Sequence, residues 1–213
     1  MRSASPLAPA ELRGNRLWMR NYAISLRSWH NRKKLLREGE CAMKQEKAYY
    51  HLPGSFEFYE LYREFLPLFR THREYFYDWC EIGSIYGAPM DCLWGGGRLG
   101  EGEDNPREVL DLMKTYHVSA RLTFSNSMLE EEHLLDPKCN TLCRLFNEAG
   151  NNGVIVHSDL LLHYLMEKYP HLYFVSSTTK VITDFNEFKE ECEREEFRYV
   201  VPVSYTHLTL PTT

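Results

Sequence analysis

Apolar side chains in the middle of the chain recur at helical spacing in several separate segments. Within residues 55–70 the apolar positions are three or four apart, which predicts one buried helix face with Ser55 as its N-cap. Four further helix starts are marked by residues that typically cap helices, namely Asn105, Asp136, Ser158 and Asp184. Pro106 and Pro137 follow two of these caps, and proline is favoured in the first turn of a helix.

Short apolar runs between these helices predict strands, at residues 79–87, 118–124, 153–157, 172–176 and 198–201. Consecutive apolar residues, as in 153–156, are typical of a parallel strand that is covered on both faces. Strands that alternate with helices favour parallel pairing, because a parallel neighbour requires a long crossover.

Two α/β architectures fit this alternation: an open, doubly wound sheet, and an incomplete (β/α) barrel of the TIM type with about five parallel strands and helices outside. A complete barrel of that type needs about 250 residues, whereas residues 43–202 provide about 160. No G-x-G-x-x-G follows the first predicted strand, so a dinucleotide-binding fold loses support.

Charge divides the chain near residue 42. Residues 1–42 carry nine Lys and Arg against three acidic residues, a net charge of +6, and the remainder carries −11. We expect 1–42 to be a translated leader ahead of a start at Met43, because residues 37–40 are encodable as a purine-rich ribosome-binding sequence. A basic arm and a targeting peptide are the alternatives.

The last residues also differ from the body of the chain. Residues 203–213 contain strand-forming residues with no helix after them, and they are similar to translated adapter sequence at the end of an assembled fragment. We therefore expect a non-native tail at 203–213, with a short natural tail as the alternative. The domain proper is expected at 43–202.

Composition narrows the class of protein. The chain has no run of 18 apolar residues, so no membrane-spanning helix and no membrane partner are expected. The acidic body does not favour nucleic-acid binding. Six irregularly spaced cysteines in 213 residues do not suggest a disulfide scaffold.

Two ordered stretches resemble a known family. Residues 153–161 read as a strand and a helix that begins at its tip, and they are followed by Tyr169-Pro170 and by the Ser/Thr run at 176–179. Together with the strand at 122–126, which ends in Asn126, this order resembles the N-terminal half of the collagenase-like peptidases (peptidase family U thirty-two) and their uncharacterised bacterial relatives. The resemblance covers about residues 79–202.

The resemblance implies a TIM-barrel-like fold and a cytoplasmic bacterial enzyme whose C-terminal half would hold clustered cysteines. Two activities are implied for the whole protein: an iron–sulfur-dependent component of RNA or quinone modification, and a hydrolase of peptide bonds. A non-catalytic fragment is the third hypothesis. Substrate and oligomeric state stay open, and we expect no turnover from this chain alone.

Candidate ligand-binding residues lie where the predicted strands end, because barrel enzymes place their sites at the carboxyl ends of strands. These ends provide Tyr86, Asn126, Ser177 and Thr178. Serine and asparagine at such positions are also ordinary turn and cap residues. Trp94 and Arg98 flank three glycines, so an aromatic ring and a guanidinium beside flexible backbone suit an anionic or planar ligand, although a plain surface loop is equally compatible.

Two residues are candidate acid–base groups. Glu81 lies in the first predicted strand, where it either points into the barrel or pairs at the surface with Arg98 or Arg121. His157 ends an apolar strand, where a neutral imidazole can shuttle protons, although a hydrogen-bonded core histidine is the commoner case. Cys139 and Cys143 share a helix face but form only half of a metal site, so no metal ligands are assigned.

Overall fold

The computed structural model describes residues 47–95 and 105–202. Six strands form one parallel sheet, with neighbours in strict sequence order. Their bounds are β1 Ala48–Pro53, β2 Cys80–Gly87, β3 Ser119–Phe124, β4 Gly153–Val156, β5 Tyr173–Ser176 and β6 Phe197–Val200. The predicted leader at 1–42, the predicted tail at 203–213 and Arg98 lie outside the described residues.

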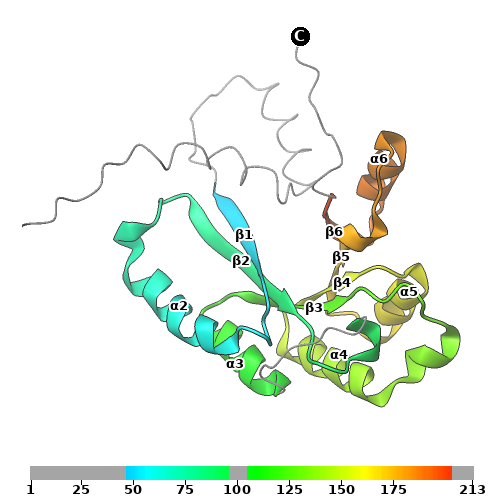
Figure 1. Ribbon diagram of the computed structural model, residues 1–213, viewed down its shortest axis with the longest axis horizontal. Coiled ribbons are helices and arrows are strands. Elements are labelled where there is room, and N and C mark those ends of the chain that lie inside the picture. The colour runs from blue at the N-terminus through cyan, green and yellow to red at the C-terminus, as the bar shows by residue number, and fades with distance from the viewer. Residues whose placement is uncertain (1–46, 96–104, 203–213) are drawn as a thin grey trace, which may run out of the picture.

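The sheet curls into a half-barrel, and the helices between its strands lie along its convex side (Figure 1). The helices are α2 Tyr59–Thr71, α3 Pro106–Thr115, α4 Pro137–Ala149, α5 Asp159–Lys168 and α6 Phe185–Glu193. A doubly wound sheet would reverse its strand order at a switch point. The unbroken order β1 to β6 therefore confirms the incomplete barrel and excludes the doubly wound alternative.

Strand β1 is the element that the sequence pattern missed. Its residues Tyr49, Tyr50 and His51 mix aromatic and polar side chains without clear alternation, and Leu52 is the only large aliphatic residue of the strand. Pairing with β2 nevertheless makes it a strand, with an irregular register between Tyr50 and His51. The described sheet therefore has six strands rather than the expected five.

Helix α2 begins later than predicted. Residues 54–58 form a turn in which Gly54 has a φ of +82° and the Phe58 N–H donates to the Gly54 carbonyl. A Cβ at residue 54 would lie 2.2 Å from the Phe58 ring, so only glycine fits. The helix starts at Tyr59, and Ser55 does not cap it.

The other four predicted caps are confirmed. The side chains of Asn105, Asp136, Ser158 and Asp184 each accept a hydrogen bond from a backbone N–H in the first turn of α3, α4, α5 and α6. Each cap satisfies a donor that the helix itself leaves unpaired. The local sequence therefore determines where these helices start.

Strand residues alternate between two environments. Leu122, Phe124 and Val154 belong to the continuous hydrophobic core between sheet and helices. Ile155 and Val175 are equally buried but are not part of that core. They occupy the alternate positions, which face the concave side of the sheet.

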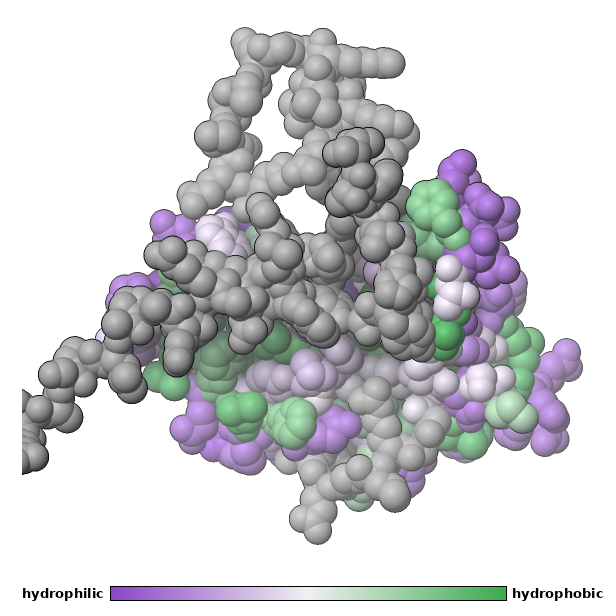
Figure 2. Space-filling view, turned by 45° about the horizontal axis from the view of Figure 1, so that its top comes forward, coloured by the Kyte–Doolittle hydropathy of each residue, from purple (hydrophilic) through white to green (hydrophobic). Residues whose placement is uncertain are grey.

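Helix α6 presents mainly charged residues to its surroundings, and the part of the surface over it is largely hydrophilic (Figure 2).

Within the described ranges, no helix combines the length and apolar character that spanning a bilayer requires.

Candidate functional site

Three of the predicted site residues come together at the carboxyl ends of β4 and β5. His157 directly follows β4, whereas Ser177 and Thr178 directly follow β5. The parallel pairing of the two strands, in which Val156 faces Ser176, places their ends side by side. The Ser177 N–H donates to the Val156 carbonyl, and this hydrogen bond extends the ladder to the rim.

Thr179 links His157 and Ser177 into one hydrogen-bonded chain. His157 Nδ1 lies 2.9 Å from Thr179 Oγ1, and Thr179 Oγ1 lies 2.8 Å from Ser177 Oγ. The short 3-10 turn Thr178–Lys180 creates this geometry, because Ser177 caps it by accepting from the Thr179 N–H. Ser177 is buried and Thr179 is exposed, so the chain runs from the interior to the surface. We call His157, Ser177 and Thr179 the rim triad.

The imidazole of the rim triad is biased toward its neutral form. Partial burial and the nearby ammonium of Lys180 lower the pKa of His157 below its ordinary value of 6.5, and the Asp159 carboxylate opposes this only in part. A neutral histidine at physiological pH has one ring nitrogen free to accept a proton. The triad therefore pairs a hydroxyl with a competent base.

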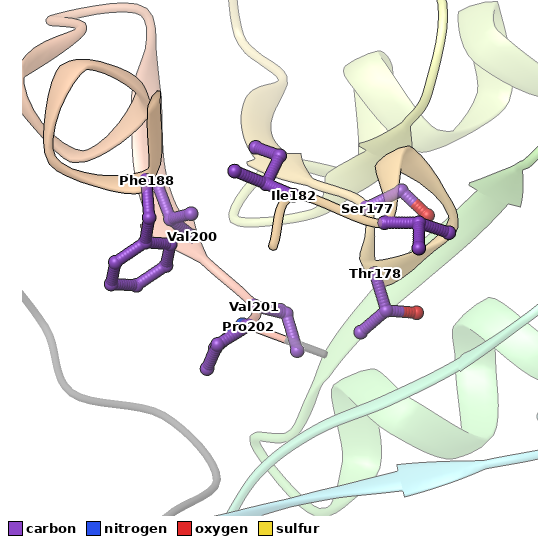
Figure 3. A pocket seen from close by; sticks show the side chains of 8 residues that line it. Ser177, Thr178, Ile182, Phe188, Val200, Val201 and Pro202 are labelled. Carbon is purple, nitrogen blue, oxygen red and sulfur yellow. The ribbon is translucent and has the colours of Figure 1, made fainter. Parts of the chain in front are cut away.

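A shallow pocket adjoins the rim triad at the ends of β5 and β6. Figure 3 shows Ser177 and Thr178 on one side of it and Phe188 and Val200 on the other. The complete lining is Ser177, Thr178, Val181, Ile182, Phe188, Val200, Val201 and Pro202. The pocket therefore has mostly apolar walls, with hydroxyls along the edge beside the rim triad.

Below the rim, a buried ionic network attaches α6 to the sheet. Glu191 accepts from Ser176 Oγ at 2.5 Å and from Lys180 Nζ at 2.8 Å. Arg194 bridges Glu191 and Asp159 at 3.2 and 2.9 Å. Burial alone would raise the pKa of Glu191, but the hydrogen bonds from Lys180 and Ser176 and the two positive charges outweigh it and hold that pKa below 4.5.

The other predicted residues do not join the rim triad. Trp94 is 0 % exposed: it packs edge-on against Phe124 and Tyr164, and its indole N–H donates to the His133 carbonyl at 2.7 Å. It is a core residue, since neither its ring nor its donor is available to a ligand. The sequence shows an aromatic beside glycines but not the direction of its ring.

Asn126, Tyr86 and Glu81 each have a different place. The Asn126 amide donates to the Leu93 carbonyl and accepts from the Met128 N–H, so both of its polar atoms hold loop backbone. Tyr86 is half-buried near the end of β2. Glu81 lies at the amino end of β2, where it pairs with Lys47 at 2.9 Å and Arg73 at 3.7 Å rather than with Arg121. The alternative partner Arg98 lies outside the described residues.

A second polar cluster, which the sequence reasoning missed, lies on the concave face of the sheet. Arg121 Nε donates to the Tyr173 hydroxyl at 2.7 Å, and Ser119 Oγ lies 2.5 Å from the same oxygen. The Tyr199 ring lies 4.8 Å from the Arg121 guanidinium carbon and 5.6 Å from the His51 ring. We call these residues, with Ser84 and Thr123, the concave cluster.

Gly153 makes room for this arrangement. A Cβ at residue 153 would lie 2.5 Å from the Tyr173 ring, so the ring lies directly against the β4 backbone. His51 Nδ1 lies 2.8 Å from Ser84 Oγ on the same face. Burial and the positive charge of Arg121 lower the pKa of His51 to about 4, so its imidazole is neutral at pH 7. The only sequence signal for this cluster was polar residues at alternate positions of otherwise apolar strands.

The described cysteines lie apart from both clusters. Cys92 and Cys139 are buried in the core with their sulfurs 3.4 Å apart. The Cys139 thiol lowers the pKa of Cys92, whereas the same pairing and burial raise the pKa of Cys139. Residues 47–95 and 105–202 contain no group of three His, Cys, Asp or Glu side chains placed to hold a metal ion.

Comparison with known proteins adds no relative: no protein-family model, no curated protein and no solved structure matches this chain.

Proposed function

We propose that this chain is part of a (β/α)-barrel hydrolase that cleaves peptide bonds, with its reacting groups in the rim triad. The observation that carries this proposal is the 2.9 Å contact between the Thr179 hydroxyl and the His157 ring nitrogen. A hydroxyl within hydrogen-bond reach of a neutral imidazole is the contact by which a general base activates a nucleophile, and here the third group, Ser177, holds the hydroxyl rather than the base. The position also agrees with where barrel enzymes carry their sites.

The chemistry follows from these contacts. Thr179 Oγ1 attacks the carbonyl carbon while its proton moves to His157 Nδ1. The C–N bond then breaks, and the imidazolium returns that proton to the departing amine. A water molecule, deprotonated by the same imidazole, hydrolyses the ester and restores Thr179. Ser177 holds the Thr179 oxygen through its 2.8 Å contact.

The resemblance to collagenase-like peptidases supports the same proposal for the whole barrel, in the cytoplasm. Its other implied activity, an iron–sulfur-dependent component of RNA or quinone modification, would act through the clustered cysteines of the family's C-terminal half and not through the rim triad. Cys92, Cys139 and Cys143 are buried in the helix-side core rather than at the rim. No nucleic-acid partner is proposed, because the body of the chain is acidic.

To test the proposal, the full chain is treated with a β-lactone probe, which acylates activated hydroxyls. The probe reacts with the hydroxyl directly and therefore does not require a complete substrate site. We expect mass spectrometry to find the adduct on Thr179. His157→Gln is expected to slow labelling at least about a hundredfold, because general-base assistance contributes that much. His163→Gln, an exposed histidine on α5, is the matched control and should label at the wild-type rate.

The pH dependence gives a second readout. Labelling requires neutral His157, so its rate should fall in acid with a midpoint below 6.5, in line with the lowered pKa. An adduct elsewhere, no adduct at all, or equal rates in the wild type and His157→Gln would contradict the proposal.

A further inference from the structure

We propose that the concave cluster binds the anionic group of a small molecule, a carboxylate or a phosphate, at Arg121. This site is distinct from the rim triad. Arg121 is the third residue of β3 and pairs with Gly153, the first residue of β4, whereas His157 lies beyond the other end of β4. The proposal therefore stands or falls independently of the hydrolase.

Arg121 carries a buried positive charge that no acidic side chain of the described ranges balances. Arg121 is 3 % exposed, and within the described ranges no Asp or Glu lies at ion-pair distance from it. Its Nε donates to a neutral phenol, the Tyr173 hydroxyl. A buried charge is costly unless an opposite charge accompanies it. A bound anion would supply that charge.

The guanidinium of Arg121 is packed against two aromatic rings and has the geometry of an anion-binding fork. The Tyr199 and Tyr173 rings lie 4.8 and 5.3 Å from its central carbon and stabilise it through cation–π contacts. The terminal nitrogens of Arg121 make no hydrogen bond to any residue of the described ranges. Those N–H groups form a rigid fork that matches two oxygens of a carboxylate or phosphate.

The residues around Arg121 include a buried hydroxyl and a second cation. Thr123, one strand repeat beyond Arg121 on the same face, is 3 % exposed, and its hydroxyl has no hydrogen-bond partner in the part of the chain that the structure describes. Such a buried hydroxyl is costly unless something pairs with it. A second cation, Arg198, lies 4.8 Å over the Tyr173 ring. His51, Tyr173 and Tyr199 are only partly buried, so the cluster reaches solvent.

The experiment is thermal unfolding of the full chain with inorganic phosphate, with succinate, and with sodium chloride at matched ionic strength. A ligand that binds only the folded state raises Tm with its concentration. We expect phosphate or succinate to raise Tm by several degrees with saturation, and the more effective anion identifies the class of ligand. If neither raises Tm beyond chloride, the proposal is overturned.

Variants locate the binding site. Arg121→Lys keeps the charge but loses the fork, so the apparent Kd should rise at least tenfold. Arg144→Lys, on the exposed face of α4, is the matched control and should leave Kd unchanged. Should Arg121→Lys not fold, Thr123→Val removes one donor and is expected to raise Kd several-fold. Wild-type affinity in a folded Arg121 or Thr123 variant, or an equal loss in Arg144→Lys, overturns the proposal.

Discussion

His51 is a histidine that the fold keeps neutral. Its folded-state pKa of about 4 lies below the ordinary 6.5 because it is buried beside Arg121. Between these two values the unfolded chain binds a proton that the folded chain does not, so acid favours unfolding in that range. Above pH 6.5 both states are neutral, and below pH 4 both are protonated.

We therefore predict that the free energy of unfolding falls by roughly 2 to 3 kcal/mol between pH 6.5 and pH 4 through this residue. Urea titrations across that range measure the slope. In His51→Asn the side chain still reaches Ser84 but no longer titrates, so the slope should flatten. A slope that stays at the wild-type value in His51→Asn would contradict the assignment.

Individual residues also show which features a local sequence pattern predicts and which it does not. The caps Asn105 and Asp136 act on backbone N–H groups two or three positions away, so a short stretch of sequence contains all the needed information. Trp94 contacts Phe124 and Tyr164, which are 30 and 70 positions away. Its burial therefore depends on packing that no local pattern encodes.

At the scale of elements, Glu191 attaches α6 to the sheet alongside the apolar packing of Phe188 and Cys192 against the core. Glu191 is the buried residue of this helix, and it connects Ser176, Lys180 and Arg194. Removing Glu191 leaves the buried Ser176 hydroxyl without its acceptor, and leaves the partly buried Lys180 and Arg194 with the exposed Asp159 as the acidic partner they share. The cost is then larger than for a surface ion pair.

We predict that Glu191→Ala lowers the free energy of unfolding by about 3 kcal/mol. Glu190→Ala, the exposed neighbour on the same helix, should change it by no more than about 0.5 kcal/mol. Chemical denaturation of both variants makes the comparison. Equal small effects would show that the network does not stabilise α6.

At the scale of the whole molecule, one hydrophobic core joins the elements from α2 to β6. It includes Tyr62 and Leu66 of α2, Phe146 of α4 and Phe197 and Val200 of β6. Elements that share one core do not unfold separately unless a boundary with few contacts divides them.

We predict a single cooperative unfolding transition for the described domain. Far-ultraviolet circular dichroism reports the helices, and tryptophan fluorescence reports the four tryptophans of the chain, among them the fully buried Trp94. The two midpoints should coincide within error in urea. Separate midpoints would mean that the curled sheet consists of two independent halves.

Local sequence is enough to specify the alternation of strands and helices, four of the five helix starts and hence the parallel α/β class, because hydrophobic period and capping act within one or two turns of chain. Long-range packing, in contrast, sets the curl of the sheet in the order β1 to β6 and brings His157, Thr179 and Ser177 together at one rim. It alone assembled the concave cluster as well, since side chains on β1, β3, β5 and β6 become neighbours only when strands distant in sequence pair in register.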